Sequence, residues 1–386
     1  MTSAQDRKGT TVKFKKLAVG AVAVGLAFSL AACSGGRGSD TAASGSTDNK
    51  GALVGVLMPN KTSTRWIHDG DAVKAGLEKL GYKVQLDYAN DNIPTQVQQM
   101  SNDITKGAKV LIVASIDGTA LSDQLDTAGK KGVKVIAYDR LINGNKNVDY
   151  YTTFDNYKVG VDQATSLLTG LGLVDADGKK VDGKGPFNVE LFAGSADDNN
   201  ATFFFNGAMA TLKPYIDDKT IVIKSGQTSF QQVATQQWDA NRAKQRMQNI
   251  IAKSYSSGVK VNGILSPYDG ISIGIISALT GAGYGGSGTK LPVITGQDAE
   301  VPSVKSIIAG QQYSTIYKDT RQLADESVKM TNDLLTGKKP TVNDTKSYNN
   351  KVKVVPSFLF QPVVVTKDNY QKVLVDSGYY SASDLK

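Results

Sequence analysis

A regular alternation of short apolar runs and helical patterns, from Gly51 onward, constrains the fold more than any other feature. Between the runs, apolar residues recur at helical spacing, as in Ala72, Val73, Leu77 and Leu80. The runs of strand length are KGALVGVLMP, YKVQLDYA, AKVLIVAS, VKVIAYDR, FNVELFAGS, KTIVIKSG, VNGILSPYDG, LPVITGQD and QYSTIYKD. Such alternation predicts an α/β protein with parallel sheets covered on both faces. Right-handed crossovers then favour doubly wound domains.

The chain is long enough for two such domains, because 386 residues exceed what a single core usually holds. The alternation breaks near Asp155, in VDYYTTFDNY, and a second apolar series begins at Phe187. We therefore expect an amino-terminal lobe of residues 51–154 and 319–354. A carboxyl-terminal lobe would comprise residues 155–318 and 355–386. Three connecting segments would form a hinge between the lobes.

The amino terminus reads as a bacterial export signal. A basic KFKK stretch precedes fourteen uncharged residues, LAVGAVAVGLAFSL, which rise about 21 Å as a helix and fall short of a membrane span. The run ends in Leu-Ala-Ala-Cys33, which resembles the lipobox of lipoproteins. We expect residues 1–33 to be a signal peptide, Cys33 to carry the lipid anchor, and residues 34–50 to form a flexible tether. The alternative is a secretory signal with an incidental cysteine.

Composition excludes several classes of protein. Cys33 is the only cysteine and His68 the only histidine, which rules out internal disulfides and leaves little room for cysteine- or histidine-based metal sites. Residues 1–32 hold five Lys or Arg and one Asp, hence +4 of the total charge of +8. The other +4 is spread along the chain without a basic block, so we expect no nucleic-acid partner.

Polar side chains follow the ends of several predicted strands. In open parallel sheets these ends line the ligand crevice. Helix capping is the alternative explanation for any single Asp or Asn at such a place. The candidate ligand-binding residues, with the only two tryptophans of the chain, are Arg65, Trp66, Asp139, Arg140, Asp198, Asn199, Asn200, Trp238, Asp269, Asp298 and Lys318.

The chemistry of this set fits a sugar. Carboxylates accept hydrogen bonds, Arg donates in a planar fork, and Asn does both, which matches a ring of adjacent hydroxyls. Tryptophan rings can cover the apolar C–H faces of a pyranose. Micromolar binding of about 12 heavy atoms needs roughly −0.7 kcal/mol per atom, which is within the range for small ligands.

Seven motifs resemble the monosaccharide-binding proteins of ABC sugar importers: RWIHDG, AYDRLI, FDNYKVG, GSADDNNA, SPYDG, TGQDAEVPSVKSI and TIYKDT. The likeness covers residues 51–386 and is closest to the multiple-sugar-binding receptors of the ChvE type, then to the xylose- and galactose/glucose-binding proteins. It implies a type I periplasmic binding protein, with two Rossmann-like lobes that a three-segment hinge joins around one sugar.

The resemblance also implies roles for residues of the amino-terminal lobe. Arg65 would bind a hydroxyl, and Trp66 would cover one face of the sugar. Asp139 and Arg140 would bind further hydroxyls.

In the other lobe, Trp238 would be the second stacking ring and Lys318 would lie at the hinge edge of the cleft. The hydroxyl-binding residues there would be Asp198, Asn199, Asn200, Asp269 and Asp298. The calcium loop of some galactose/glucose-type members has no match, since Lys179 stands where a third ligand belongs. We therefore expect no metal and no cofactor.

The sequence thus predicts a membrane-tethered, monomeric, non-enzymatic receptor outside the cytoplasmic membrane. It would capture an aldohexose or aldopentose, such as glucose, galactose, xylose or arabinose, and deliver it to an ABC permease. A furanose, an autoinducer-like ligand or a sensing role remain open alternatives. Glycoside hydrolysis is disfavoured because Arg140 beside Asp139 favours the ionised carboxylate. A sugar-responsive repressor would carry a DNA-binding helix-turn-helix at its amino terminus.

Overall fold

The computed structural model describes residues 49–175, 178–181, 184–256, 258–286 and 288–386. The predicted signal peptide, Cys33 and nearly all of the predicted tether therefore lie outside the described residues. Ser46–Lys386 form one compact unit. Within its described part, no helix combines the length and the apolar character that a membrane crossing requires.

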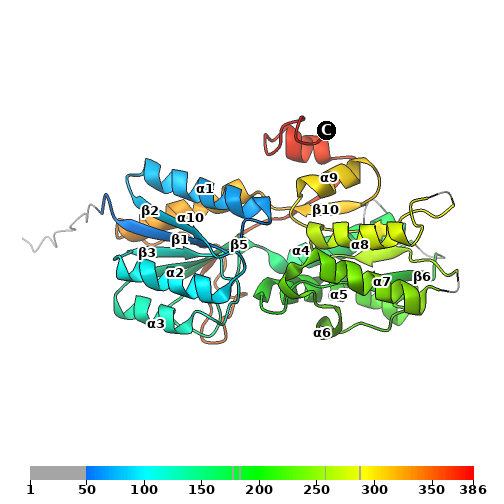
Figure 1. Cartoon of the computed structure of the whole chain (residues 1–386), viewed down its shortest axis with the longest axis horizontal. Coiled ribbons are helices and arrows are strands. Elements are labelled where there is room, and N and C mark those ends of the chain that lie inside the picture. Colours follow the sequence, from blue (N-terminus) through cyan, green and yellow to red (C-terminus); the bar gives the residue numbers. More distant parts are fainter. Residues whose placement is uncertain (1–48, 176–177, 182–183, 257, 287) are drawn as a thin grey trace, which may run out of the picture. The chain divides into compact units, whose positions relative to one another are not determined.

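The amino-terminal lobe is built on a six-stranded sheet in the order β11-β5-β4-β3-β1-β2, and every pairing is parallel (Figure 1). Its elements are β1 (Leu53–Met58), α1 (Thr64–Lys79), β2 (Lys83–Tyr88), α2 (Ile93–Thr105), β3 (Val110–Val113), α3 (Ser122–Lys130), β4 (Lys134–Tyr138), β5 (Tyr150–Phe154), α10 (Thr320–Leu335) and β11 (Ser357–Phe360).

Helices cover both faces of this sheet, because successive strand residues are apolar on both sides. Leu57 belongs to the core under α2 and α3, while its neighbours Val56 and Met58 pack under α1 and α10. All three side chains are fully buried. The predicted parallel, doubly covered sheet is confirmed here.

The carboxyl-terminal lobe contains a four-stranded parallel sheet, β7-β6-β8-β9, and an antiparallel pair, β10-β12. Its elements are α4 (Asn156–Gly170), β6 (Phe187–Leu191), α5 (Asn199–Asp217), β7 (Ile221–Val222), α6 (Phe230–Val233), the 3-10 turn η1 (Gln236–Trp238), α7 (Ala240–Ser254), β8 (Gly263–Leu265), α8 (Asp269–Gly281), β9 (Val293–Ile294), α9 (Val301–Ile308), β10 (Ser314–Tyr317), β12 (Val363–Thr366) and the π-helical turn η2 (Gln371–Val375). Helices α4 and α5 share one core with this sheet, and α7 and α8 share the other.

Three segments connect the two lobes. Asp155 stands between β5 and α4, and residues 318–319 join β10 to α10. The last crossing, residues 361–362, lies between β11 and β12. The predicted boundary between residues 354 and 355 falls too early, because β11 pairs in register with β5 and therefore belongs to the first sheet.

Candidate functional site

A cavity of about 510 Å³ lies where the strands of both lobes end. Asp139 follows β4 directly, Lys318 follows β10, and Asp298 lies four residues after β9. The side chains in its wall come from both sides of the hinge. Of the eleven predicted residues, nine line the cavity: Arg65, Trp66, Asp139, Arg140, Asp198, Asn200, Trp238, Asp298 and Lys318.

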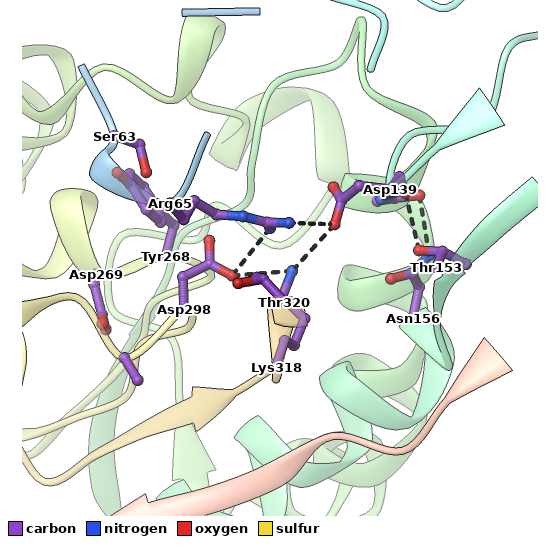
Figure 2. A network of polar contacts seen from close by, with 12 residues as sticks. Ser63, Arg65, Asp139, Thr153, Asn156, Tyr268, Asp269, Asp298, Lys318 and Thr320 are labelled. Carbon is purple, nitrogen blue, oxygen red and sulfur yellow. Dashed lines mark hydrogen bonds and ion pairs between the residues drawn. The ribbon is translucent and has the colours of Figure 1, made fainter. Parts of the chain in front are cut away.

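A buried group of alternating charges forms the centre of this wall (Figure 2). Arg65 Nη2 lies 3.0 Å from Asp139 Oδ2, and Arg65 Nη1 lies 3.6 Å from Asp298 Oδ1. Lys318 Nζ lies 3.0 Å from Asp298 Oδ1 and 3.9 Å from Asp139 Oδ2. Arg65 is also paired at 2.9 Å with Asp69, a buried residue one turn along α1 that sequence reasoning did not single out. Lys318 is thus shared by two carboxylates and Arg65 by three.

The charges decide the protonation state of Asp139. Burial alone would raise its pKa, but Arg65, Lys318 and Arg140 outweigh burial and hold the pKa of this carboxyl below its usual value. An ionised carboxylate accepts hydrogen bonds and donates none. Asp139 is therefore suited to accept a ligand hydroxyl and unsuited to act as a general acid.

The backbone of Asp139 is held in an uncommon conformation. Its φ is 59°, in the left-handed region that residues with a side chain rarely adopt. Its main-chain carbonyl accepts hydrogen bonds from Tyr151 Oη at 2.6 Å, Thr153 Oγ1 at 2.9 Å and Asn200 Nδ2 at 2.7 Å. These three donors hold the turn that presents the carboxylate to the cavity.

Arg140 and Asp198 form a second ion pair, which joins the two lobes. Arg140 Nε lies 3.2 Å from Asp198 Oδ2, and the guanidinium lies over the Trp66 ring at 5.3 Å from its centroid. Asp198 also caps α5, since its carboxylate accepts the backbone N–H of Asn200 at 2.9 Å. Burial raises the pKa of Asp198 despite Arg140. Asp198 therefore both caps α5 and lines the cavity.

The Trp238 ring is held by its neighbours. It makes edge-to-face contacts with Tyr268 and Phe204, with centroids 6.0 Å and 6.3 Å apart. Its backbone φ is 56°, and a Cβ on Gly194 would lie 2.0 Å from the ring. The Trp238 ring can therefore occupy this place beyond β6 only because residue 194 is a glycine. The indole N–H is buried and has no hydrogen-bond acceptor among the described residues.

Two predicted residues do not line the cavity. Asn199, at the start of α5, is half-buried beside it. Asp269 is fully buried behind the wall, where its carboxylate accepts from the Glu300 backbone N–H at 2.8 Å, Thr315 Oγ1 at 3.0 Å and Gln312 Nε2 at 3.1 Å. Burial and nearby Glu300 raise the pKa of Asp269 well above its ordinary value. From this position Asp269 supports the loop that carries Asp298.

Several polar residues in the wall were not predicted. Ser63 Oγ, from the amino-terminal lobe, donates to Glu300 Oε1 of the other lobe at 2.6 Å, and Tyr268 Oη donates to the same oxygen at 2.9 Å. Gln297 precedes Asp298 and also lines the cavity, with its buried Oε1 unbonded in the described structure. Position after a strand was the available signal for Tyr268 and Gln297, whereas nothing in the sequence marks Ser63.

No three His, Cys, Asp or Glu side chains among the described residues are placed to hold a metal ion. The acidic run at 175–179 lies partly outside those residues. The predicted absence of calcium stays a prediction.

Comparison with known proteins identifies the family. The model of the periplasmic binding protein domain matches residues 54–339. The multiple sugar-binding periplasmic receptor ChvE of Rhizobium radiobacter is 57% identical over 333 residues, which are 86% of this chain and 92% of that protein. The multiple sugar-binding periplasmic protein SbpA of Azospirillum brasilense is 52% identical over 86% of this chain and 91% of its own.

A solved structure is similar throughout its length. An ABC transporter solute-binding protein of Clostridium phytofermentans, with bound β-D-glucose, superposes with a TM-score of 0.81 at 45% identity and covers 86% of this chain and 100% of its own. The resemblance inferred from the motifs and the predicted type I fold are both confirmed. The chain belongs to the periplasmic binding protein family.

Proposed function

We propose that this protein captures a monosaccharide in the cavity between its lobes and delivers it to an ABC transporter permease. The observation that carries the proposal is the buried group of Arg65, Asp139, Asp298 and Lys318, which lines the same cavity as Trp66 and Trp238. Alternating donors and acceptors between aromatic rings suit a ring of hydroxyls with apolar faces. The bound glucose of the Clostridium phytofermentans relative supports an aldose of this size.

The charge balance of the wall favours a neutral ligand. Arg65, Arg140 and Lys318 each already pair with a carboxylate of the protein. A phosphate or carboxylate ligand would have to compete with those carboxylates for the same cations, whereas a hydroxyl can be added to each pair as a further donor or acceptor. Hydrogen bonds to such charged groups are also stronger than those between neutral groups.

Closure of the lobes would follow from contacts that join them. Asn200 to Asp139, Arg140 to Asp198 and Ser63 to Glu300 all link one lobe to the other around the cavity. A sugar held by residues of both lobes has a higher affinity for the closed form, and it shifts the open–closed balance by that difference. The closed form would be the one that the permease recognises, and the protein itself catalyses no reaction.

The location is part of the proposal. Relatives named as periplasmic receptors support an extracytoplasmic site of action. Residues 1–33 would be the signal peptide, and residues 34–50 the tether. Two acyl chains on Cys33 would anchor a monomer durably, where one chain would be marginal.

Isothermal titration calorimetry tests the function. A chain that begins at Ser34 contains the whole compact unit Ser46–Lys386 and lacks Cys33. It would be titrated with glucose, galactose, xylose, arabinose, ribose and fructose. We expect one-to-one binding of at least one aldose with a Kd of about 1 μM, lost in Asp139→Ala and in Trp238→Ala. Folded, ligand-free protein that binds none of the six sugars would refute the assignment.

A further inference from the structure

The loop that carries Asp298 has an unusual backbone. Asp298 and Ala299 follow one another with φ values of 89° and 50°. Neither is glycine, and two consecutive residues in the left-handed region are unfavourable for side-chain-bearing residues. Contacts elsewhere in the protein must therefore hold this part of the cavity wall.

Hydrogen bonds from two segments of the lobe hold the loop. At β10, the N–H of Asp298 donates to the Ile316 carbonyl at 2.8 Å, and the N–H of Ala299 donates to Thr315 Oγ1 at 3.1 Å. Near the carboxyl terminus, Tyr380 Oη donates to the carbonyl of Ala299 at 3.0 Å. Tyr380 lies six residues before the last residue of the sequence and is not part of the cavity wall.

Tyr380 belongs to a carboxyl-terminal segment, residues 369–386, that lies beside α9 (Figure 1). Leu374 and Leu385 of this segment share a buried cluster with Ala299 itself. Burial and the neighbouring Tyr379 raise the pKa of Tyr380, so that its phenol remains a donor. The segment is thus packed directly behind the Asp298 loop.

The same segment contacts the crossing that carries Lys318. The Tyr379 ring packs edge to face on Tyr317, with centroids 4.8 Å apart. Arg321, on the other side of Lys318, donates to the Ser377 carbonyl at 3.2 Å and lies over the Tyr379 ring at 5.2 Å. The segment therefore contacts the chain on both sides of Lys318, whose Nζ lies 3.0 Å from Asp298 Oδ1.

We propose that Tyr380 is a positioning residue for ligand binding: its hydrogen bond to Ala299 holds the Asp298 carboxylate in its place beside Lys318. The proposal rests on the proposed function, because it requires a sugar that contacts Asp298. The remainder of the segment couples this loop to the hinge crossing at residues 318–319. The carboxyl terminus thereby contributes to affinity without touching the ligand.

Tyr380→Phe tests this role, since it retains the ring and removes only the hydroxyl. We expect the Kd for sugar to rise about fivefold, which corresponds to about 1 kcal/mol. The matched control is Tyr370→Phe, in the same segment, whose half-buried phenol makes no hydrogen bond within the described structure. This control should bind sugar like the parent chain.

A rescue distinguishes positioning from general stability. Glycine adopts positive φ without strain, so Ala299→Gly added to Tyr380→Phe should recover part of the lost affinity. Sugar binding by the parent chain tests the proposed function separately. If the parent chain bound no sugar, the proposed function would be refuted, and not the role of Tyr380 alone. Parent-like affinity in Tyr380→Phe, an equal loss in Tyr370→Phe, or a double variant that binds no more tightly than Tyr380→Phe would overturn the inference. Thermal melting of each variant confirms that it is folded.

Discussion

The side-chain amide of Asn200, on α5, donates a 2.7 Å hydrogen bond to the main-chain carbonyl of Asp139, which follows β4 of the other lobe. The Asn200 Oδ1 atom in turn lies 3.0 Å from both Tyr151 Oη and Asn156 Nδ2. A residue of the carboxyl-terminal lobe thus helps to fix the backbone that presents Asp139. The position of the carboxylate and the closure of the lobes are therefore linked.

Asn200→Ala should weaken sugar binding about tenfold or more. The change removes the hydrogen bonds with Asp139 and Tyr151, which exist only when the lobes are together, at about 1 kcal/mol each, so it disfavours the closed form. Calorimetry gives the Kd, with Asn199→Ala as the control, because Asn199 is the adjacent residue and lies outside the cavity wall. Equal affinities for both variants would contradict the role of Asn200 in closure.

Gly194→Ala should lower affinity by at least about tenfold, because the new methyl group would lie 2.0 Å from the Trp238 ring and displace it. Tryptophan fluorescence would report the displacement, and titration would report the affinity. Gly281→Ala is the matched control, since a Cβ at that position meets no atom within 4 Å. Unchanged fluorescence and affinity in Gly194→Ala would show that the ring does not need this glycine.

Ser63→Ala should raise the Kd for sugar about tenfold at pH 7, the effect of losing about 1.4 kcal/mol from a charge-assisted hydrogen bond. Burial raises the pKa of Glu300, and the hydrogen bond from Ser63 opposes that rise. Without Ser63, Glu300 should bind a proton at a higher pH than in the parent chain. An affinity that matches the parent chain from pH 5 to pH 8 would argue against this contact between the lobes.

Asp103→Asn should stabilise the protein at neutral pH. Asp103 is fully buried on α2, neither carboxylate oxygen has a hydrogen-bond partner, and burial raises its pKa to about 6. The folded state therefore binds this proton more tightly than the unfolded state, so the parent chain loses stability as the pH rises from about 4 to about 6.

The shift corresponds to at most about 3 kcal/mol, and solvent screening reduces it. We expect Asp103→Asn to raise the free energy of unfolding by about 1 kcal/mol at pH 7.5 and by nearly nothing at pH 4. Urea denaturation at the two pH values measures the difference. A variant that is less stable than the parent chain at pH 7.5 would refute this account of Asp103.

Much of the fold was predictable, because the period and length of the apolar runs identify strands and helices from the local sequence. The sheet that β11 joins was not predictable. Ser357–Phe360 and Val363–Thr366 are two similar apolar runs separated by two residues, yet they join different sheets. Pairing partners far away in the sequence decide this choice, and a local pattern carries no information about them.

The candidate site was likewise predictable only in part. Asp269 and Asp298 both follow strands, and their positions in the sequence do not distinguish them. Asp269 begins α8 directly and points into the protein, whereas the positive φ of Asp298 places its carboxylate in the cavity. The role of Ser63 and Glu300 depends on the hydrogen bond between them, in which Ser63 Oγ donates to Glu300 Oε1 of the other lobe at 2.6 Å.

A crystal structure with the sugar that binds most tightly in calorimetry tests the central claim most directly. We predict one pyranose between Trp66 and Trp238, with hydroxyls within hydrogen-bond distance of Asp139, Asp298 and Lys318. The Asn200 to Asp139 hydrogen bond should be intact in that complex. A sugar bound outside this cavity, or one that makes no contact with these carboxylates, would contradict the account.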